Sequence, residues 1–134
     1  MGARNTTNGS ENSLLIADDS TTSLLVHSQI LSPHYRVQST HSGLQAVEIA
    51  MRDRPHAVVL DLMMPDLDGA EVCRRIKAVA ELENTPVLFV TARTDEEAIA
   101  SCKAAGAVAV LTKPVGQDEL LAAVAAAIAS ANPD

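Results

Sequence analysis

The segment Val58–Gly69, with the sequence VVLDLMMPDLDG, constrains the fold of this chain more than any other. With Ala57 in front, it opens on a short apolar run rich in β-branched residues and then stops at a carboxylate, Asp61. Such a run is typical of a strand buried on both faces, in the middle of a parallel sheet. A buried strand rarely ends in a charged residue unless that charge has a role. We therefore expect Asp61 at the carboxyl end of a central strand, the edge at which open α/β sheets bind ligands.

Similar apolar runs alternate with helical patterns along the whole chain. The predicted strands are Ser13–Ala17, Tyr35–Ser39, Ala57–Leu60, Val87–Val90 and Ala107–Leu111. The predicted helices are Ser20–Leu31, Gly43–Met51, Gly69–Ala80, Asp95–Ala105 and Gln117–Ala131. This alternation predicts an α/β fold, with a parallel sheet covered by helices on both faces. Right-handed crossovers then bring the carboxyl ends of all strands to one edge.

The composition limits the classes of function. The 134 residues are 47% hydrophobic, which suits one domain with one core. Residues 1–12 are polar and predicted to be a disordered tail, so residues 13–134 form the predicted domain. No apolar stretch approaches ~18–20 residues, so we expect no membrane span. A net charge of −7 without a basic cluster argues against direct binding of nucleic acid.

The location of the protein is predicted from two further features. The N-terminus lacks the charged and apolar pattern of a signal peptide. Cys73 and Cys102 fall inside helical patterns and are expected to be buried thiols in a reducing compartment. We therefore expect a cytoplasmic protein.

Polar residues follow four of the five predicted strands and should meet at one edge of the sheet. They are Asp18 and Asp19, Asp61, Thr91 and Lys113. Two like charges ~5 Å apart repel by roughly 3 kcal/mol at an effective dielectric constant of ~20. Mg²⁺ relieves such crowding because it prefers oxygen ligands and keeps open positions for a phosphoryl oxygen. A carboxylate nucleophile, Mg²⁺, an ammonium and a hydroxyl together suit in-line phosphoryl transfer, with Asp61 as the nucleophile.

The motifs that contain these residues are similar to those of a known family. The chain has no P-loop, so the phosphoryl donor is expected to be a phosphorylated partner or a small phosphodonor rather than bound ATP. From Leu14 to Ala131 it resembles the receiver domain of bacterial response regulators, of the chemotaxis-regulator type. The motifs that carry the resemblance are Asp18-Asp19, Asp61-Leu-Met-Met-Pro-Asp-Leu-Asp-Gly, Thr91-Ala92 and Lys113-Pro114. The resemblance implies a flavodoxin-like, doubly wound sheet of five parallel strands in the order 2-1-3-4-5, with five helices.

The resemblance also implies a role for each site residue. Asp61 would accept a phosphoryl group from a phosphohistidine on a sensor histidine kinase or a histidine phosphotransfer protein. The implied metal ligands are Asp19 and Asp61, the backbone carbonyl of Met63, and Asp18 mainly through water. The groups implied to contact the phosphoryl oxygens are the side chains of Thr91 and Lys113 and the backbone N–H of Ala92. A cis peptide is implied before Pro114.

A protein of this kind is a phosphoacceptor that assists its own phosphorylation and dephosphorylation, and not an enzyme acting on other substrates. The starting Met and the polar tail favour a stand-alone regulator in two-component signalling or a phosphorelay. It would bind a downstream protein through its fourth helix, fifth strand and fifth helix. Val110 stands where the family usually has an aromatic switch residue, so we expect a smaller or differently distributed conformational change. Arg93 is expected to border the site and tune the loss of phosphate.

Two other functions fit parts of the sequence. Asp66-Leu-Asp-Gly resembles the nucleophile motif of haloacid-dehalogenase-type phosphatases, although Pro65 interrupts the strand before it. A receiver that no longer accepts phosphate and serves only as an interaction domain is the second alternative, favoured mildly by Val110.

Some residues also have plain structural interpretations. Asp18 and Asp19 could cap the helix that follows them. Asp68-Gly69 is expected to form a turn and a helix start, without a chemical role. The four histidines are expected on the surface; they are His27, His34, His41 and His56.

Overall fold

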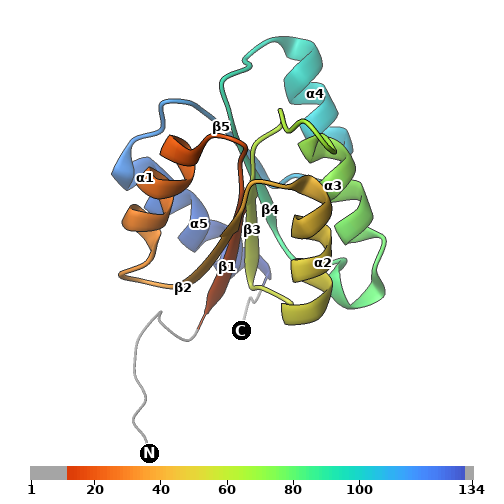
Figure 1. Cartoon of the computed structure of the whole chain (residues 1–134), viewed down its shortest axis with the longest axis horizontal. Helices are drawn as coiled ribbons and strands as arrows, with labels where there is room; N and C mark the ends of the chain where they lie inside the picture. Colours follow the sequence, from red (N-terminus) through yellow and green to blue (C-terminus); the bar gives the residue numbers. More distant parts are fainter. Residues whose placement is uncertain (1–11, 132–134) are drawn as a thin grey trace, which may run out of the picture.

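The computed structural model describes residues 12–131, in which strands and helices alternate along the chain (Figure 1). The strands are β1 (Ser13–Ala17), β2 (Arg36–Thr40), β3 (Ala57–Leu60), β4 (Val87–Thr91) and β5 (Ala109–Thr112). The helices are α1 (Thr21–Leu31), α2 (Gly43–Asp53), α3 (Gly69–Lys77), α4 (Glu96–Ala104) and α5 (Gln117–Ala131), with a 3₁₀ turn, η3, at Ala80–Leu82. All strand pairs are parallel, in the order β2-β1-β3-β4-β5. This confirms the predicted α/β fold and its flavodoxin-like strand order.

The predicted disordered tail lies outside the described residues, except for Asn12. The carbonyl of Asn12 accepts a hydrogen bond from the backbone N–H of Arg36 at 2.9 Å. Asn12 therefore already takes part in the pairing of β1 with β2, one residue before the strand begins.

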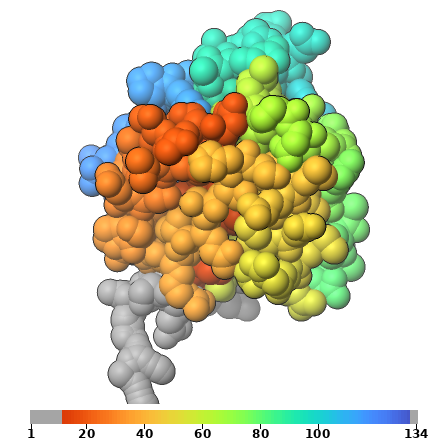
Figure 2. All heavy atoms as spheres, viewed as in Figure 1, coloured from red at the N-terminus to blue at the C-terminus, as the bar shows by residue number. Residues whose placement is uncertain are grey.

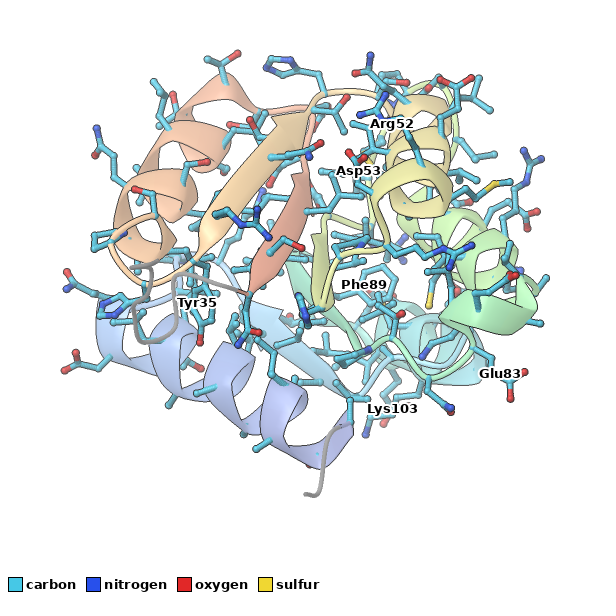
Figure 3. All side chains as sticks on the ribbon, turned by 90° about the horizontal axis from the view of Figure 1, so that it is seen from below. Tyr35, Arg52, Asp53, Glu83, Phe89 and Lys103 are labelled. Atoms are coloured by element: carbon cyan, nitrogen blue, oxygen red, sulfur yellow. The ribbon has the colours of Figure 1, made fainter. Side chains whose placement is uncertain are left out.

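Helices cover both faces of the sheet: α1 and α5 lie on one side, and α2, α3 and α4 on the other (Figure 3). The central strands supply both cores because successive side chains of a strand point to opposite faces. In β4, Phe89 packs with the α2–α3–α4 side, whereas Leu88 and Val90 pack with the α1–α5 side. Tyr35 lies on that second side, between α1 and α5 (Figure 3). All four residues of β3 are buried, as its apolar sequence predicts.

Helix α2 continues two residues past its predicted end at Met51, to Asp53. Two further predicted boundaries are wrong by two or three residues, and backbone hydrogen bonds explain one of them. The strand predicted from Ala107 begins only at Ala109. The N–H of Ala107 instead bonds to the carbonyl of Cys102 at 3.1 Å, and the N–H of Gly106 bonds to that of Lys103 at 3.0 Å. This is a Schellman end for α4, and Gly106 supports it with a positive φ of 111°.

The other boundary concerns α3, which ends at Lys77 and not at the predicted Ala80. The chain turns through η3 before β4 begins, and Leu82 of that turn is buried. The apolar stripe that suggested a longer helix is still used, because Val79 packs against the core from outside the helix.

The predicted surface position of His27 is wrong, because the residue is only 5% exposed. Leu24, His27 and Leu31 are the buried residues of α1. Their spacing of three and four residues places them on one face of the helix, which the sequence pattern could have revealed. Burial lowers the pKa of His27, with the charge of Lys113 acting in the same direction and that of Asp18 against it.

The expected burial of the cysteine thiols is confirmed, since Cys73 and Cys102 are both free and buried. Burial raises the pKa of Cys73 to about 11 and also raises that of Cys102. Among the helices of residues 12–131, none has the length and apolar character needed to cross a membrane.

Candidate functional site

The ends of the strands hold the backbones of the candidate site residues in place. The N–H of Asp61 donates to the carbonyl of Ala17 at 2.9 Å, and the N–H of Asp18 donates to that of Thr40 at 3.1 Å. The N–H of Lys113 donates to the carbonyl of Thr91 at 2.9 Å. The pairing of the sheet thus continues one residue past the strands. For this reason the polar residues that end separate apolar runs lie along a single edge.

An acidic cluster forms at this edge. Asp18, Asp19 and Asp61 each offer a carboxylate oxygen, and these atoms lie within 4.8 Å of one another. Asp18 is 2% exposed and Asp61 is 6% exposed, whereas Asp19 is open to solvent. The predicted grouping of the three acids is therefore present, with Asp61 at its buried side.

Lys113 joins two of these acids. Its Nζ lies 2.8 Å from Oδ2 of Asp18 and 3.2 Å from Oδ2 of Asp61. Its side chain is only 18% exposed, so the ammonium is largely shielded from solvent. The peptide bond between Lys113 and Pro114 is cis, which confirms the expectation from the resemblance.

The other oxygens of the buried acids accept backbone hydrogen bonds. Oδ1 of Asp18 accepts from the N–H of Ser20 at 2.9 Å, and Oδ1 of Asp61 accepts from the N–H of Met63 at 3.2 Å. Helix α1 is capped by Ser20, whose hydroxyl accepts from the N–H of Ser23 at 3.2 Å. The alternative in which Asp18 and Asp19 cap this helix is therefore wrong, because its N-cap is Ser20, and the Asp18 carboxylate accepts from the N–H of that residue.

The electrostatics of the cluster show an excess of negative charge. Burial raises the pKa of Asp61, and the charge of Asp18 raises it further. The N–H of Met63 and the ammonium of Lys113 act in the opposite direction without cancelling this shift. For Lys113, burial alone would lower the pKa, but its hydrogen bonds and charge attraction to the two acids raise it overall. One ammonium does not neutralise three carboxylates, so the site favours a further cation.

The residues expected to contact phosphoryl oxygens lie at the ends of β4 and β5. Thr91 is the last residue of β4 and is buried, and its hydroxyl accepts a hydrogen bond from the N–H of Arg93 at 3.1 Å. Ala92 follows it and is exposed. The Arg93 guanidinium forms an ion pair with Asp95 at 2.8 Å, two residues further along. The roles of Thr91 and Ala92, and that of Arg93 in phosphate loss, stay predictions.

Gly69 is a site residue whose importance the sequence analysis missed. A Cβ atom at this position would lie 2.3 Å from the carbonyl oxygen of Asp61 and 2.8 Å from the ring of Phe89. Only glycine lets the start of α3 approach the end of β3 this closely. The predicted turn and helix start are confirmed beside it, since the Asp68 carboxylate caps α3 by accepting from the N–H of Glu71 at 2.9 Å.

Asp66, the nucleophile of the phosphatase alternative, is not part of the acidic cluster. Its carboxylate accepts hydrogen bonds from Ser42, Gly43 and Leu44 at the start of α2. Asp18 and Asp19, which follow β1, are grouped with Asp61 and not with Asp66. Lys113 contacts Asp18 and Asp61, as the phosphoacceptor hypothesis predicts.

The donor set fits Mg²⁺ by its chemistry. Hard divalent cations of this size take oxygen ligands and are usually held by one or two carboxylates together with water. Asp18, Asp19 and Asp61 each offer a carboxylate oxygen. Both oxygens of Asp18 and both of Asp61 already take part in hydrogen bonds or ion pairs, whereas Asp19 is exposed. The Met63 carbonyl, two residues after Asp61, stays a predicted ligand.

Fold and site together define a flavodoxin-like domain with an acidic, lysine-containing cluster at the carboxyl ends of its strands. Comparison with known proteins gives the family. The chain belongs to the response regulator receiver domain family, whose model matches residues 14–125.

Individual relatives agree with this assignment. The chain is 41% identical over 100 residues to response regulator MprA of Mycobacterium leprae, covering 75% of this chain and 43% of that protein. It therefore spans less than half the length of the curated relatives it matches.

Solved structures of similar proteins have the same fold. The receiver domain of the sensor histidine kinase PA1611 from Pseudomonas aeruginosa superposes with a TM-score of 0.82 at 30% identity, covering 87% of this chain and 97% of that one. That structure has a magnesium ion coordinated in its active-site cleft. The chemotaxis protein CheY4 of Vibrio cholerae superposes with a TM-score of 0.82 at 27% identity, covering 87% and 98% of the two chains.

Proposed function

We propose that Asp61 accepts a phosphoryl group from a phosphohistidine on a sensor histidine kinase or a histidine phosphotransfer protein. The observation that carries this proposal is the position of the Asp61 carboxylate, 3.2 Å from Lys113 and grouped with Asp18 and Asp19 at the carboxyl edge of the sheet. Asp61 is the carboxylate of the cluster that directly follows β3, the central strand of the sheet. The family assignment supports the same reaction, because receiver domains are phosphorylated by histidine kinases.

In the proposed reaction, an oxygen of Asp61 forms a bond to phosphorus while the bond between phosphorus and the histidine nitrogen breaks. The Met63 N–H and the Lys113 ammonium hold the carboxylate before the donor arrives. Lys113, the Thr91 hydroxyl and the Ala92 N–H would then stabilise the charge on the transferring oxygens. A bound Mg²⁺, held by Asp61, Asp19 and the Met63 carbonyl with Asp18 acting through water, would neutralise part of that charge.

The product is an aspartyl phosphate that acts as a signal. The proposal therefore describes a phosphoacceptor of two-component signalling or a phosphorelay in the cytoplasm, and not an enzyme that acts on other substrates. The readout would be binding of a downstream protein at the face made of α4, β5 and α5, without direct contact to nucleic acid. Val110 on β5 is partly buried against the core between the sheet and α4, so it can transmit only a small movement compared with an aromatic residue.

The test is phosphorylation by acetyl phosphate in the presence of Mg²⁺, followed by intact-protein mass spectrometry. The wild-type protein should gain one phosphoryl group, and Asp61→Asn should gain none. Asp53→Asn is the matched control, because Asp53 is an aspartate at the far end of α2 and should leave phosphorylation unchanged. Absence of both phosphorylation and Mg²⁺ binding in the wild type would instead support the non-phosphorylated interaction domain, and labelling that persists in Asp61→Asn would point to another acceptor.

A further inference from the structure

Asp66, in the segment between β3 and α3, is bound to the beginning of a different helix. Its Oδ2 accepts hydrogen bonds from the Ser42 hydroxyl at 2.7 Å and from the Leu44 N–H at 3.1 Å. Its Oδ1 accepts from the Gly43 N–H at 3.0 Å. One side chain thus joins the segment after β3 to the first turn of α2, more than twenty residues earlier in the chain.

The local chemistry explains why α2 accepts this carboxylate. The first N–H groups of a helix have no partner within the helix, and a negative charge is favourable there. Ser42, the N-cap of α2, satisfies only the N–H of Gln45, and α2 has no acidic residue in its own first turn. The Ser42 hydroxyl and the amides of Gly43 and Leu44 lower the pKa of Asp66 to about 2. Asp66 is therefore ionised, and bound, at neutral pH.

A backbone contact occurs at the same place. A Cβ atom on Gly43 would lie 2.5 Å from the carbonyl oxygen of Leu67, the residue after Asp66. The segment after β3 therefore lies directly against the start of α2, as the space-filling view also shows (Figure 2). Hydrogen bonds and backbone contact together fix the second half of this segment.

The first half of the segment contacts the acidic cluster through its backbone. The N–H of Met63 donates to Asp61 at 3.2 Å, and the N–H of Gly69 closes the segment by donating to the Leu62 carbonyl at 2.8 Å. Leu62 and Met64 are buried, but the side chain of Met63 between them is exposed. Packing of its own side chain therefore contributes little to placing the Met63 backbone, which depends on how the rest of the segment is held.

We propose that Asp66 is a positioning residue for the metal site, because it ties the segment that carries Met63 to the rigid start of α2. This inference rests on the proposed function, since it assigns the Met63 carbonyl to the metal. Asp66 does not touch the phosphoryl group or the metal. It acts through the segment, as groups hydrogen-bonded behind metal ligands do in other sites.

The experiment compares Mg²⁺ affinity and local backbone protection in matched variants of the whole chain. Asp66→Ala removes all three hydrogen bonds, and Asp66→Asn keeps an amide oxygen that can still accept some of them. Asp53→Asn is the control, because Asp53 ends the same helix and its carboxylate accepts hydrogen bonds from Gln38 and Arg52 (Figure 3). Calorimetry measures Mg²⁺ binding, and NMR measures exchange of the Met63 amide in the metal-free protein.

We expect Asp66→Ala to weaken Mg²⁺ binding by about tenfold, Asp66→Asn by less, and Asp53→Asn not measurably. In the metal-free protein, the Met63 amide should exchange roughly fivefold faster in Asp66→Ala than in the wild type. A variant with a lower melting temperature but unchanged Mg²⁺ affinity and Met63 exchange would show that Asp66 only caps α2, and would overturn the proposal. If Asp66→Ala does not fold, Asp66→Asn decides in the same way.

Failure of the proposed function gives a different result. In that case the wild type itself neither binds Mg²⁺ nor becomes phosphorylated, whichever residue stands at position 66. The exchange rate of Met63 still tests the positioning role, because it needs no metal: an unchanged rate in the Asp66 variants overturns that role, and a faster rate supports it.

Discussion

At the scale of single residues, the acidic cluster groups side chains that suit the binding of a cation. In the metal-free protein the same grouping lowers the stability of the fold. Asp61 has a raised pKa because it is buried beside Asp18, and Lys113 offsets only part of the repulsion. A carboxyl group whose pKa is higher in the folded than in the unfolded protein stabilises the fold below its ordinary pKa, and this contribution is lost as the pH rises through the folded value. At neutral pH the ionised Asp61 therefore destabilises the metal-free protein.

We accordingly expect Asp61→Asn to raise the melting temperature of the metal-free protein at pH 7 by roughly 3–6 °C, about 1–2 kcal/mol. The advantage over wild type should shrink as the pH falls, because Asp61 then takes up a proton and loses its charge. Thermal unfolding in EDTA from pH 7 to pH 4 tests both statements. Equal melting temperatures at pH 7, or a difference that grows toward acid, would contradict this account.

Lys113 should have the opposite effect. In Lys113→Ala, the buried Asp18 and Asp61 lose their common cation, and we expect the metal-free protein to lose about 1–3 kcal/mol of stability. Addition of Mg²⁺ should stabilise this variant more than wild type, because no ammonium competes for the same carboxylates. Urea unfolding with and without Mg²⁺ measures both effects.

Lys103→Ala on α4 is the control for Lys113→Ala, since Lys103 is exposed and does not belong to the acidic cluster. The two lysine variants should differ clearly in metal-free stability. If they lose the same amount, the ion pairs of Lys113 contribute nothing measurable.

At the scale of elements, the site depends on how closely α3 approaches the end of β3. Helix α3 is well anchored by buried residues along one face, namely Ala70, Val72, Cys73 and Ile76. Its first residue, Gly69, contacts the Asp61 carbonyl so closely that no side chain fits between them. The position of Asp61 is thus coupled to the packing of a whole helix.

Gly69→Ala should lower the free energy of unfolding by about 1–3 kcal/mol, because the added methyl group forces α3 away from β3. The matched control is Gly116→Ala before α5, where a Cβ meets nothing within 4 Å. That change should be neutral or slightly stabilising, by at most about 1 kcal/mol. Chemical denaturation of the two variants gives the comparison, and equal stabilities would mean that the close approach at Gly69 relaxes without cost.

At the scale of the whole molecule, the helices differ in how firmly they are held. The buried residues of α4 are only Ala98 and Cys102, both small. A cavity of about 410 Å³ lies between α4 and the segment after β3, with Met63, Arg93 and Glu97 among its lining residues. Since α4 begins four residues after Ala92, it is the element that we expect to respond if Thr91 and Ala92 engage a phosphoryl group.

Hydrogen exchange should reveal this difference. We expect amides of α4 to exchange at least about tenfold faster than those of α3 in the metal-free protein, because fewer buried contacts oppose local opening. Mg²⁺ with beryllofluoride should change exchange mainly in residues 91–104, and Asp61→Asn should abolish the change. Equal protection of α3 and α4, or a response at η3 rather than α4, would show that the conformational change is distributed differently.

The sequence alone determined the architecture and indicated that Asp18, Asp19, Asp61 and Lys113 lie together. Short continuous apolar runs, broken at turns and alternating with helical stripes, predict a parallel α/β sheet, and Asp61 directly follows one of its fully buried strands. Because parallel strands all end at one edge, the positions of Asp18, Asp61, Thr91 and Lys113 along that edge could be predicted from their places at strand ends.

Only the tertiary structure decided which groups touch. Local sequence did not show that Lys113 bridges two acids or that Gly69 must lack a side chain. Asp66 illustrates the reason: its partners lie more than twenty residues away on α2, and contacts across that separation arise only when the helices pack on the sheet. Sequence periodicity reports which face of an element is buried, but pairwise contacts depend on the distances between elements once they are folded.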